Sequence, residues 1–401
     1  MDFELPEELR MLKETVRRFV DREIIPIERE AYDGHKMKPD VRAHLEAKAQ
    51  EIGLWNYDVP EEYGGQGMGM LARCVIWEEM GRTIAIPTRG GGVFGPAVSP
   101  ILYYLNEEQK KKYLYPVIEG KRWGCFMQTE PDAGGDPGGM RTTAVRQGDH
   151  YVINGYKRFI TGADRADFAQ VLAATDRAKG SRGGISAFLV DMDTPGVKLV
   201  RPQETMMDDR PWEIALEDVK VPVENRIYEE NKGWDCAKFL LGNERSGIAR
   251  VGASKAQIRR LREIAAMERI GDRPLIEDER FAMKIAAIEV ELKALEMTQL
   301  RVVAAERTRR GNKPDPASSI LKIKGSEIQQ NISELLMEAI GPYALPDQLP
   351  HAEDERWNEP PVGPDYAAPL APMYFNWRKI SIYGGSNEIQ KNIIAKAILG
   401  L

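Results

Sequence analysis

A polar, glycine-rich stretch over residues 125–164 contains the side chains and backbone groups best suited to chemistry. Its first part reads Cys-Phe-Met-Gln-Thr-Glu-Pro-Asp-Ala-Gly-Gly-Asp-Pro-Gly-Gly-Met, ending at Met140. Glycine has no Cβ, so such a backbone can turn with positive φ and bring its N–H groups close to a ligand. The composition suits a cradle for a cofactor, but it is also common in turn-rich β segments that bind nothing.

The second part of the stretch predicts a β-hairpin. Residues 151–153 are extended in character, Asn154-Gly155 favours a type I′ turn, and residues 156–161 return. A polar loop joined to a hairpin suits the body of a planar cofactor.

Metal and disulfide chemistry are not indicated by the sequence. The four histidines are scattered and lack metal-ligand spacing, which argues against a metal site. They are His35, His44, His150 and His351. The three cysteines, Cys74, Cys125 and Cys236, are odd in number and far apart. Free thiols in a reducing, cytoplasmic compartment are therefore expected.

The rest of the chain must position this stretch. Along the chain, the pattern of hydrophobic residues changes twice. Residues 1–121 read mostly as helices, with Leu9, Leu12 and Val16 at helical spacing. Residues 122–230 contain short strand-like runs separated by Pro, Gly and Asp. Residues 231–401 return to long helical patterns. We therefore expect an N-terminal helical domain, a middle β domain and a C-terminal helical domain with these limits.

The middle domain is predicted to be all-β. Its expected strands cover residues 151–153, 158–161, 168–174, 185–190, 197–200 and 213–216. No helix alternates with them, and no Gly-x-Gly-x-x-Gly follows a strand, so a Rossmann unit is not expected.

Long helices with short connections indicate a helical bundle after residue 231. Residues 234–267 are predicted to form one long helix. The last helix, residues 387–399, is expected to bury Ile389, Ile393, Ile394 and Ile398. Before it, residues 342–372 are rich in proline, and such a segment fits either a substrate-binding element or an oligomerisation loop.

Composition limits the classes of function. The chain has 401 residues, of which 42% are hydrophobic, enough for two or three domains. Its net charge of −6 favours neither nucleic acid nor an anionic membrane surface as a partner. The sequence contains no run of 18 apolar residues, so no membrane span is expected. The acidic N-terminus lacks the apolar core of a signal peptide.

Four motifs in this order resemble those of the acyl-CoA dehydrogenase family. They read Gln128-Thr-Glu-Pro-Asp-Ala-Gly-Gly-Asp, Tyr151-Val-Ile-Asn-Gly-Tyr-Lys-Arg-Phe-Ile-Thr-Gly-Ala, Val221-Pro-Val-Glu-Asn and Ile382-Tyr-Gly-Gly-Ser-Asn-Glu-Ile-Gln. The resemblance spans nearly the whole chain. It implies an α+β multidomain fold: an N-terminal all-α domain, a middle β-barrel and a C-terminal four-helix bundle.

The resemblance also implies a flavoenzyme that oxidises an acyl-CoA. FAD would lie between the barrel and the bundle of a homotetramer, built as paired dimers, or of a homodimer. Family members remove a proton from Cα of the thioester and a hydride from Cβ, which goes to flavin N5, and electron-transferring flavoprotein reoxidises them. The flavin supplies the redox chemistry, while the protein supplies binding, orientation and a base.

By this resemblance, Gln128, Thr129, Gly134 and Gly135 line the flavin and its pyrophosphate. The family usually has Ser where Gly135 stands, so only a backbone N–H can serve there. Phe159 takes a position that is often Trp and stacks near the isoalloxazine. The hydroxyl of Thr161 matches one that hydrogen-bonds the N5 region.

Three residues of the C-terminal domain complete the predicted cofactor site. Ser386 and Glu388 match positions that contact the flavin or its phosphates, although Ser386 could equally be the N-cap of the last helix. Gly341 is the one recognisable residue of a segment that touches the adenine of a neighbouring subunit's FAD. Arg269 or Arg273 could replace an arginine with a similar role.

The catalytic base is where the sequence departs from most of the family. Many members carry Glu where this chain has Gly384, which cannot take a proton. A minority use a Glu at the start of the first bundle helix, and Glu244 matches it. A carboxylate enclosed beside an acyl chain should have a raised pKa that suits proton removal, with Arg245 holding it in place. The alternative is a helix salt bridge between Glu244 and Arg245 without chemistry.

Two further functions remain open. A flavoenzyme of the same fold with altered chemistry, such as an acyl-CoA desulfinase or an oxidase, would explain the missing Glu at 384. A non-catalytic subunit of a heteromeric acyl-CoA dehydrogenase would explain the unmatched FAD contacts. The acyl group itself does not follow from the sequence.

Overall fold

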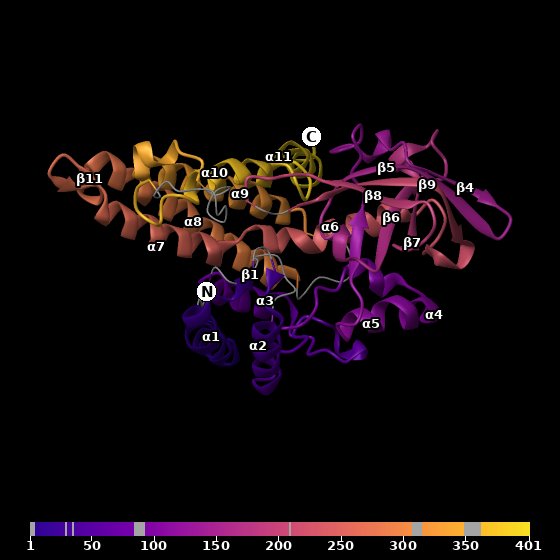
Figure 1. Ribbon diagram of the computed structural model, residues 1–401, viewed down its shortest axis with the longest axis horizontal. Coiled ribbons are helices and arrows are strands. Elements are labelled where there is room, and N and C mark those ends of the chain that lie inside the picture. The colour runs from indigo at the N-terminus through magenta and orange to yellow at the C-terminus, as the bar shows by residue number, and fades with distance from the viewer. Residues whose placement is uncertain are drawn as a thin grey trace, which may run out of the picture.

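The structure of the protein is a computed structural model that covers most of the chain. The described residues are 5–28, 30–33, 36–83, 93–207, 210–306, 315–348 and 362–401. Within them, the side chains of residues 32, 33, 36, 241–246, 248 and 306 lie outside the description. Figure 1 shows the first helices beneath, a helical bundle to one side and a sheet to the other.

The N-terminal helices enclose an apolar core of their own. Val16 and Phe19 lie three residues apart on one face of α1 and are buried in one cluster with Ile76 of α3. The helices are α1 (Glu7–Phe19), α2 (Pro39–Glu51), α3 (Gly69–Met80), α4 (Glu107–Gln109) and α5 (Tyr115–Ile118), and the short strands are β1 (Tyr32–Asp33) and β2 (Lys36–Met37).

Among the described residues, eight strands form one sheet in the middle of the chain. They are β3 (Gly124–Met127), β4 (Thr143–Gln147), β5 (His150–Ile160), β6 (Phe168–Ala174), β7 (Ile185–Asp191), β8 (Val197–Pro202), β9 (Trp212–Pro222) and β10 (Arg226–Ile227). Their order is β10-β7-β6-β4-β5-β9-β8, and β3 runs parallel to β6. Every residue of β6 is buried, so both faces of this central strand are covered.

The described strands form an open sheet, not the closed barrel that the family resemblance implies. β10 and β8 stand at the two ends of the order and do not pair with each other among the described strands. Most residues of β8 are exposed, and it ends at Pro202, which has no N–H to donate to a further strand.

The turn predicted at Asn154-Gly155 is wrong. β5 runs through both residues, and its hairpin with β4 turns at Gly148, whose φ is +63°. A Cβ on Gly155 would lie 2.2 Å from Oγ1 of Thr142. Gly155 therefore permits a close approach of two backbones and not a reversal of the chain.

The C-terminal helices pack around α9, which buries residues on most of its surface. α9 contacts α6, α7, α8, α10 and α11, so the described part of the bundle has four long helices with two shorter ones beside them. Their limits are α6 (Gly233–Ile248), α7 (Val251–Met267), α8 (Glu279–Glu306), α9 (Ser318–Ile340), α10 (Leu370–Asn376) and α11 (Asn387–Ile394). The hairpin of β11 (Arg269–Ile270) and β12 (Arg273–Pro274) joins α7 to α8.

Two expectations about these helices are wrong. The single helix predicted over residues 234–267 breaks at Arg250, which adopts a left-handed conformation with φ of +46° between α6 and α7. Ile389 and Ile398 were expected to be buried, but they are 38% and 48% exposed in the single chain because the last helix lies at its surface.

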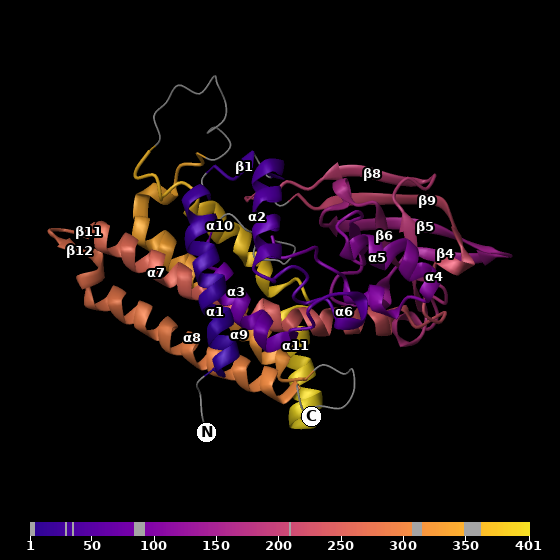
Figure 2. The same cartoon turned by 90° about the horizontal axis from the view of Figure 1, so that it is seen from below.

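Two glycines allow the helices of the C-terminal bundle to pack closely against the N-terminal helices and against the sheet. A Cβ on Gly252 of α7 would lie 2.4 Å from Cα of Glu78 in α3, and one on Gly233 of α6 would lie 2.4 Å from the carbonyl carbon of Ser186 in β7. Figure 2 shows α6 reaching from the bundle toward the sheet. None of the described helices is long and apolar enough to cross a membrane.

Candidate functional site

The loop after β3 lies along β5. The carbonyl of Gln128 accepts a hydrogen bond from Lys157 Nζ at 3.1 Å, and the carbonyl of Thr129 accepts one from the N–H of Arg158 at 2.9 Å. These contacts bring Gln128 and Thr129 beside Phe159, the next residue of β5. The three residues were predicted for one site, and the structure places them close together.

A buried ion pair anchors this loop. Nζ of Lys157 lies 2.8 Å from Oε1 of Glu130, and Glu130 also accepts the N–H groups of Arg141 and Thr142. Burial lowers the pKa of Lys157 to about 8, although Glu130 opposes the shift. Burial would raise the pKa of Glu130, but the charge of Lys157 and the hydrogen bonds bring it below its usual value.

Sequence reasoning missed the pair of Lys157 and Glu130. The available signal was the alternation of β5: Tyr151, Ile153 and Lys157 share one side of the strand, so a lysine stands where an apolar residue is expected.

The glycines of the loop are open to a ligand. Gly134 and Gly135 are exposed, and a Cβ on either would meet no atom within 4 Å. Nearby, Oε1 of Gln128 is buried and has no hydrogen-bond partner within the part of the chain that the structure describes. A buried amide oxygen without a donor is unusual in a folded protein, so it marks a place for a ligand donor or water.

Phe159 presents its ring to the surface. The side chain is 55% exposed, and the residue has φ of +59°, a region that a bulky L residue rarely adopts. Such a conformation costs about 1–3 kcal/mol and persists where the surroundings fix it. Thr161 follows β5 and is exposed too. A flat ring, a hydroxyl and free backbone donors together can bind a planar polar ligand.

A second set of predicted residues gathers at the start of α11. The hydroxyl of Ser386 accepts the N–H of Ile389 at 3.4 Å, so Ser386 is the N-cap of this helix. Glu388 is exposed, and its own backbone N–H and the Ser386 hydroxyl lower its pKa. Figures 1 and 2 place α11 at the end of the bundle that faces the sheet.

Polar contacts with α9 hold the turn before α11. Gln390 donates to the carbonyls of Gly384 and Gly385 and accepts from the hydroxyl of Ser319. Nζ of the fully buried Lys322 lies 2.8 Å from Oδ1 of Asn387. Burial lowers the pKa of Lys322 to about 8, with Glu388 opposing the shift.

Three further residues were predicted for the site, two as catalytic and one as cofactor-binding. Glu244 and Arg245 lie in the second half of α6 and not at the start of the first bundle helix, where the resemblance implies the base. Their side chains lie outside the described residues. Gly341 follows the last residue of α9, whereas Lys322 near the start of α9 touches α11. With 1.5 Å of rise per residue, Gly341 lies roughly 30 Å from that contact within one chain.

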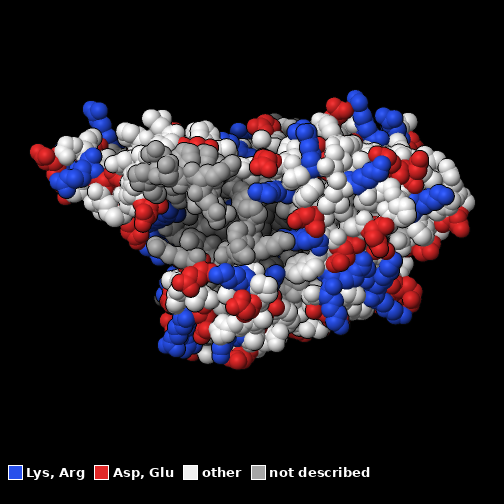
Figure 3. Space-filling view, viewed as in Figure 1, with Lys and Arg blue, Asp and Glu red and all other residues white. Residues whose placement is uncertain are grey.

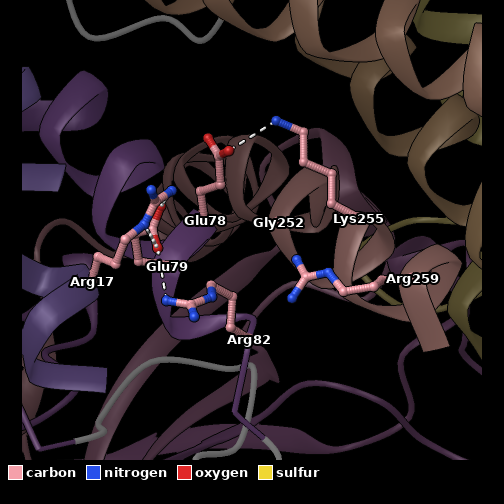
Figure 4. A pocket seen from close by; sticks show the side chains of 7 residues that line it. All are labelled: Arg17, Glu78, Glu79, Arg82, Gly252, Lys255 and Arg259. Carbon is pink, nitrogen blue, oxygen red and sulfur yellow. Dashed lines mark hydrogen bonds and ion pairs between the residues drawn. The ribbon is translucent and has the colours of Figure 1, made fainter. Parts of the chain in front are cut away.

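One polar cleft is described between the N-terminal helices and α7 (Figure 4). It has a volume of about 300 Å³. Its lining comprises Arg17, Glu78, Glu79, Arg82, Gly252, Lys255 and Arg259. Arg17 forms two hydrogen bonds with Glu79, and Lys255 pairs with Glu78 at 2.8 Å. The lining carries four cationic side chains and two carboxylates, so the cleft keeps an excess of positive charge. The pair of Lys255 and Glu78 joins α7 to α3 across it.

Charges of both signs are interspersed over the face shown in Figure 3. The basic run directly after α4 is paired with carboxylates: Lys110 with Glu107, Lys111 with Glu108 and Lys112 with Asp191. The described residues contain no group of His, Cys, Asp or Glu arranged to hold a metal ion.

Three family patterns match consecutive parts of the chain. "Acyl-CoA dehydrogenase, N-terminal domain" matches residues 6–121, "Acyl-CoA dehydrogenase, middle domain" matches residues 125–219, and "Acyl-CoA dehydrogenase, C-terminal domain" matches residues 231–399.

Individual proteins match over nearly their whole length. The mouse mitochondrial short-chain specific acyl-CoA dehydrogenase is 31% identical, over 99% of this chain and 91% of that protein. Subunit CarC of the caffeyl-CoA reductase-Etf complex of Acetobacterium woodii is 29% identical, over 98% of both chains. The structure of butyryl-CoA dehydrogenase from Megasphaera elsdenii superposes with a TM-score of 0.77 at 26% identity, over 100% of both chains.

Proposed function

We propose that this chain, which belongs to the acyl-CoA dehydrogenase family, uses FAD to dehydrogenate an acyl-CoA thioester between Cα and Cβ. The observation that carries the proposal is the match of all three family domains, in order, to a chain that presents an exposed Phe159 beside its glycine-rich loop. The domain limits 1–121, 122–230 and 231–401 are part of the proposal.

The residues near Phe159 fit a flavin. The exposed ring of Phe159 matches a flat aromatic group, and the unpartnered Oε1 of Gln128 matches a ligand N–H. The open backbone at Gly134 and Gly135 suits phosphate oxygens. Together with Thr129 and Thr161, these residues would hold the cofactor, which when bound would accept the hydride from Cβ.

Glu244 is the proposed base for the α-proton. Gly384 carries no side chain, and its backbone has φ of +67°, a conformation suited to glycine. This conformation supports a turn that lacks the Glu many family members have there. The first bundle helix supplies Glu244 instead, and enclosure beside an acyl chain would raise the pKa of its carboxyl toward neutrality. Arg245 would orient it.

We extend the proposal to partners and assembly. The name of the Acetobacterium woodii relative places that protein in a complex with Etf, which supports electron-transferring flavoprotein as the acceptor. Gly341 lies far from α11 within one chain, so its predicted contact with FAD would be made in a neighbouring subunit of a homodimer or homotetramer. A cytoplasmic location is part of the same proposal.

The test is a purified homomeric protein mixed with acyl-CoA thioesters in the absence of oxygen. We expect a yellow protein that bleaches on mixing and forms an enoyl-CoA. Bleaching without an enoyl product would point to altered chemistry, such as that of a desulfinase. A colourless protein that cannot be reconstituted with FAD would refute the proposal and favour a partner subunit of a heteromer.

A further inference from the structure

β5 carries a bulge opposite Glu213 of β9. The pairing of the two strands is regular from Gly155 to Lys157 and resumes at Ile160, so Arg158 and Phe159 share one opposing residue. A bulge leaves one strand with backbone groups that the ladder does not satisfy, and it redirects the side chain at that point.

In this bulge, a side chain accepts the backbone hydrogen bond that a carbonyl of the neighbouring strand would otherwise accept. The N–H of Phe159 donates to Oε1 of Gln203 at 3.1 Å. Gln203 follows the end of β8, and its own N–H donates to the carbonyl of Pro211 at 2.7 Å. The left-handed conformation of Phe159 is therefore held from outside its own strand pair.

Glu213 fixes the orientation of the Gln203 amide. Nε2 of Gln203 lies 3.3 Å from Oε1 of Glu213, which is only 4% exposed. Arg201 and Tyr156 donate to the other carboxylate oxygen at 2.7 and 2.8 Å. An ionised carboxylate only accepts and a backbone N–H only donates, so one amide orientation satisfies both neighbours: nitrogen toward Glu213 and oxygen toward Phe159.

We propose that Gln203 is a positioning residue for the flavin: oriented by Glu213, its amide oxygen holds Phe159 in the bulge so that the phenyl ring faces the isoalloxazine. This inference rests on the proposed function, because it requires FAD against this face. Gln203 itself need not touch the cofactor. Gln203 affects the cofactor only through its hydrogen bond to the N–H of Phe159. Substitutions of Gln203 and Phe159 are therefore expected to have non-additive effects on FAD affinity.

The experiment measures the dissociation constant of FAD from reconstituted apoprotein in wild type, Phe159→Ala, Gln203→Met and the double variant. Loss of an aromatic contact should raise the constant roughly five- to tenfold in Phe159→Ala. Gln203→Met, which keeps most of the side-chain volume but loses the acceptor, should raise it by a similar factor. The double variant should bind no more weakly than Phe159→Ala, because both changes remove one contact.

Asn154→Ala is the matched control. Asn154 also belongs to β5, and its Oδ1 accepts the N–H of Asp218 at 2.8 Å, where Asp218 is left-handed with φ of +50°. Its loss should leave FAD affinity within about twofold of wild type. In the apoprotein, hydrogen exchange over residues 156–162 should accelerate in Gln203→Met and not in Asn154→Ala.

Each contrary result has its own meaning. Wild-type protein that binds no FAD would refute the proposed function. If wild type binds FAD but Phe159→Ala binds it equally well, the function stands and the positioning role falls. An unchanged affinity in Gln203→Met, additive losses in the double variant, or an equal loss in Asn154→Ala would each overturn the role of Gln203.

Discussion

Lys157 and Lys322 are both fully buried, but they differ in the groups that compensate their charge. Lys157 faces the carboxylate of Glu130, which also accepts two backbone N–H groups. Lys322 has the amide oxygen of Asn387 as its acceptor. Breaking a buried pair leaves a charge in a medium of low polarity, whereas an ammonium beside an amide can lose its proton instead.

Lys157→Met is expected to lower the free energy of unfolding by about 3–5 kcal/mol, because Glu130 would remain buried and charged. Urea denaturation measures the change. In the double variant Lys157→Met/Glu130→Gln, no buried charge remains, so part of the loss should be recovered. A loss below about 1 kcal/mol in the single variant would show that the pair does not anchor the loop.

The pKa of Lys322 predicts how stability changes in mildly alkaline solution. Its value of about 8 in the folded protein lies below the ordinary 10.5. Between these values the unfolded chain binds the proton and the folded chain does not, so stability rises with pH by up to about 1.4 kcal/mol per unit.

The matched experiment compares wild type with Lys322→Met between pH 7 and 9.5. Above pH 8, the free energy of unfolding should increase with pH more in wild type than in the variant. The shift of Lys157 is in the same direction and is present in both proteins, so it cancels in the difference. Parallel pH profiles would contradict a lowered pKa for Lys322.

Sequence reasoning proposed single residues where a motif carried them, and their roles stay predictions. It placed Gln128, Thr129 and Phe159 in one site, and the structure brings these three together. It missed Glu130, Gln203 and Glu213, because their roles depend on a strand register and a bulge that have no local signature.

At the scale of elements, two backbone turns flank the proposed base Glu244 and the position of Gly384. α6 ends where Arg250 turns left-handed, and this break separates the Glu244 region from α7. Before α11, Gly384 and Gly385 both have positive φ, and Gln390 binds both of their carbonyls. The turn at Arg250 was not predicted, because the sequence around it continues a helical pattern.

Gly384→Glu, which restores the residue common in the family, is expected to destabilise the protein by about 1–2 kcal/mol without creating a second base. The left-handed conformation disfavours a residue with a Cβ. Gly384→Asn should be milder, because asparagine tolerates this region. Thermal unfolding and turnover measure both effects. Undiminished stability together with activity independent of Glu244 would contradict the expectation.

At the scale of the whole molecule, the single chain leaves large apolar side chains uncovered. Met283 and Val290 lie seven residues apart on one face of α8 and are 72% and 71% exposed, while the other face of α8 is buried. Ile389 and Ile398 of the C-terminal segment are exposed as well. Exposed apolar faces of this kind are typical of contacts between proteins, and the proposed assembly of several copies of the chain would cover them.

Val290→Asp is expected to reduce the molar mass in solution and the FAD content together, because Gly341 would serve a neighbouring subunit. Light scattering and the flavin absorbance measure the two quantities. Val145→Asp is the control, since Val145 is 56% exposed on β4 of the sheet. Assembly unaffected by Val290→Asp, or equally disturbed by Val145→Asp, would contradict a subunit contact on α8.

The order of helices, strands and helices was predictable because hydrophobic periodicity is a local property. The predicted strand 168–174 coincides with β6, and 185–190 falls within β7. An open sheet, the burial of Lys322 and the exposure of Ile389 were not predictable, because each depends on which distant segment or partner covers a surface.

The central claim is that Glu244 removes the α-proton of an acyl-CoA in a flavin-containing enzyme. The most direct measurement is the anaerobic rate of flavin bleaching by an acyl-CoA substrate in wild type and in Glu244→Gln, at equal FAD content. Loss of a general base predicts a rate at least about a hundredfold lower in the variant, with FAD and assembly retained. Bleaching of Glu244→Gln at the wild-type rate would contradict the account.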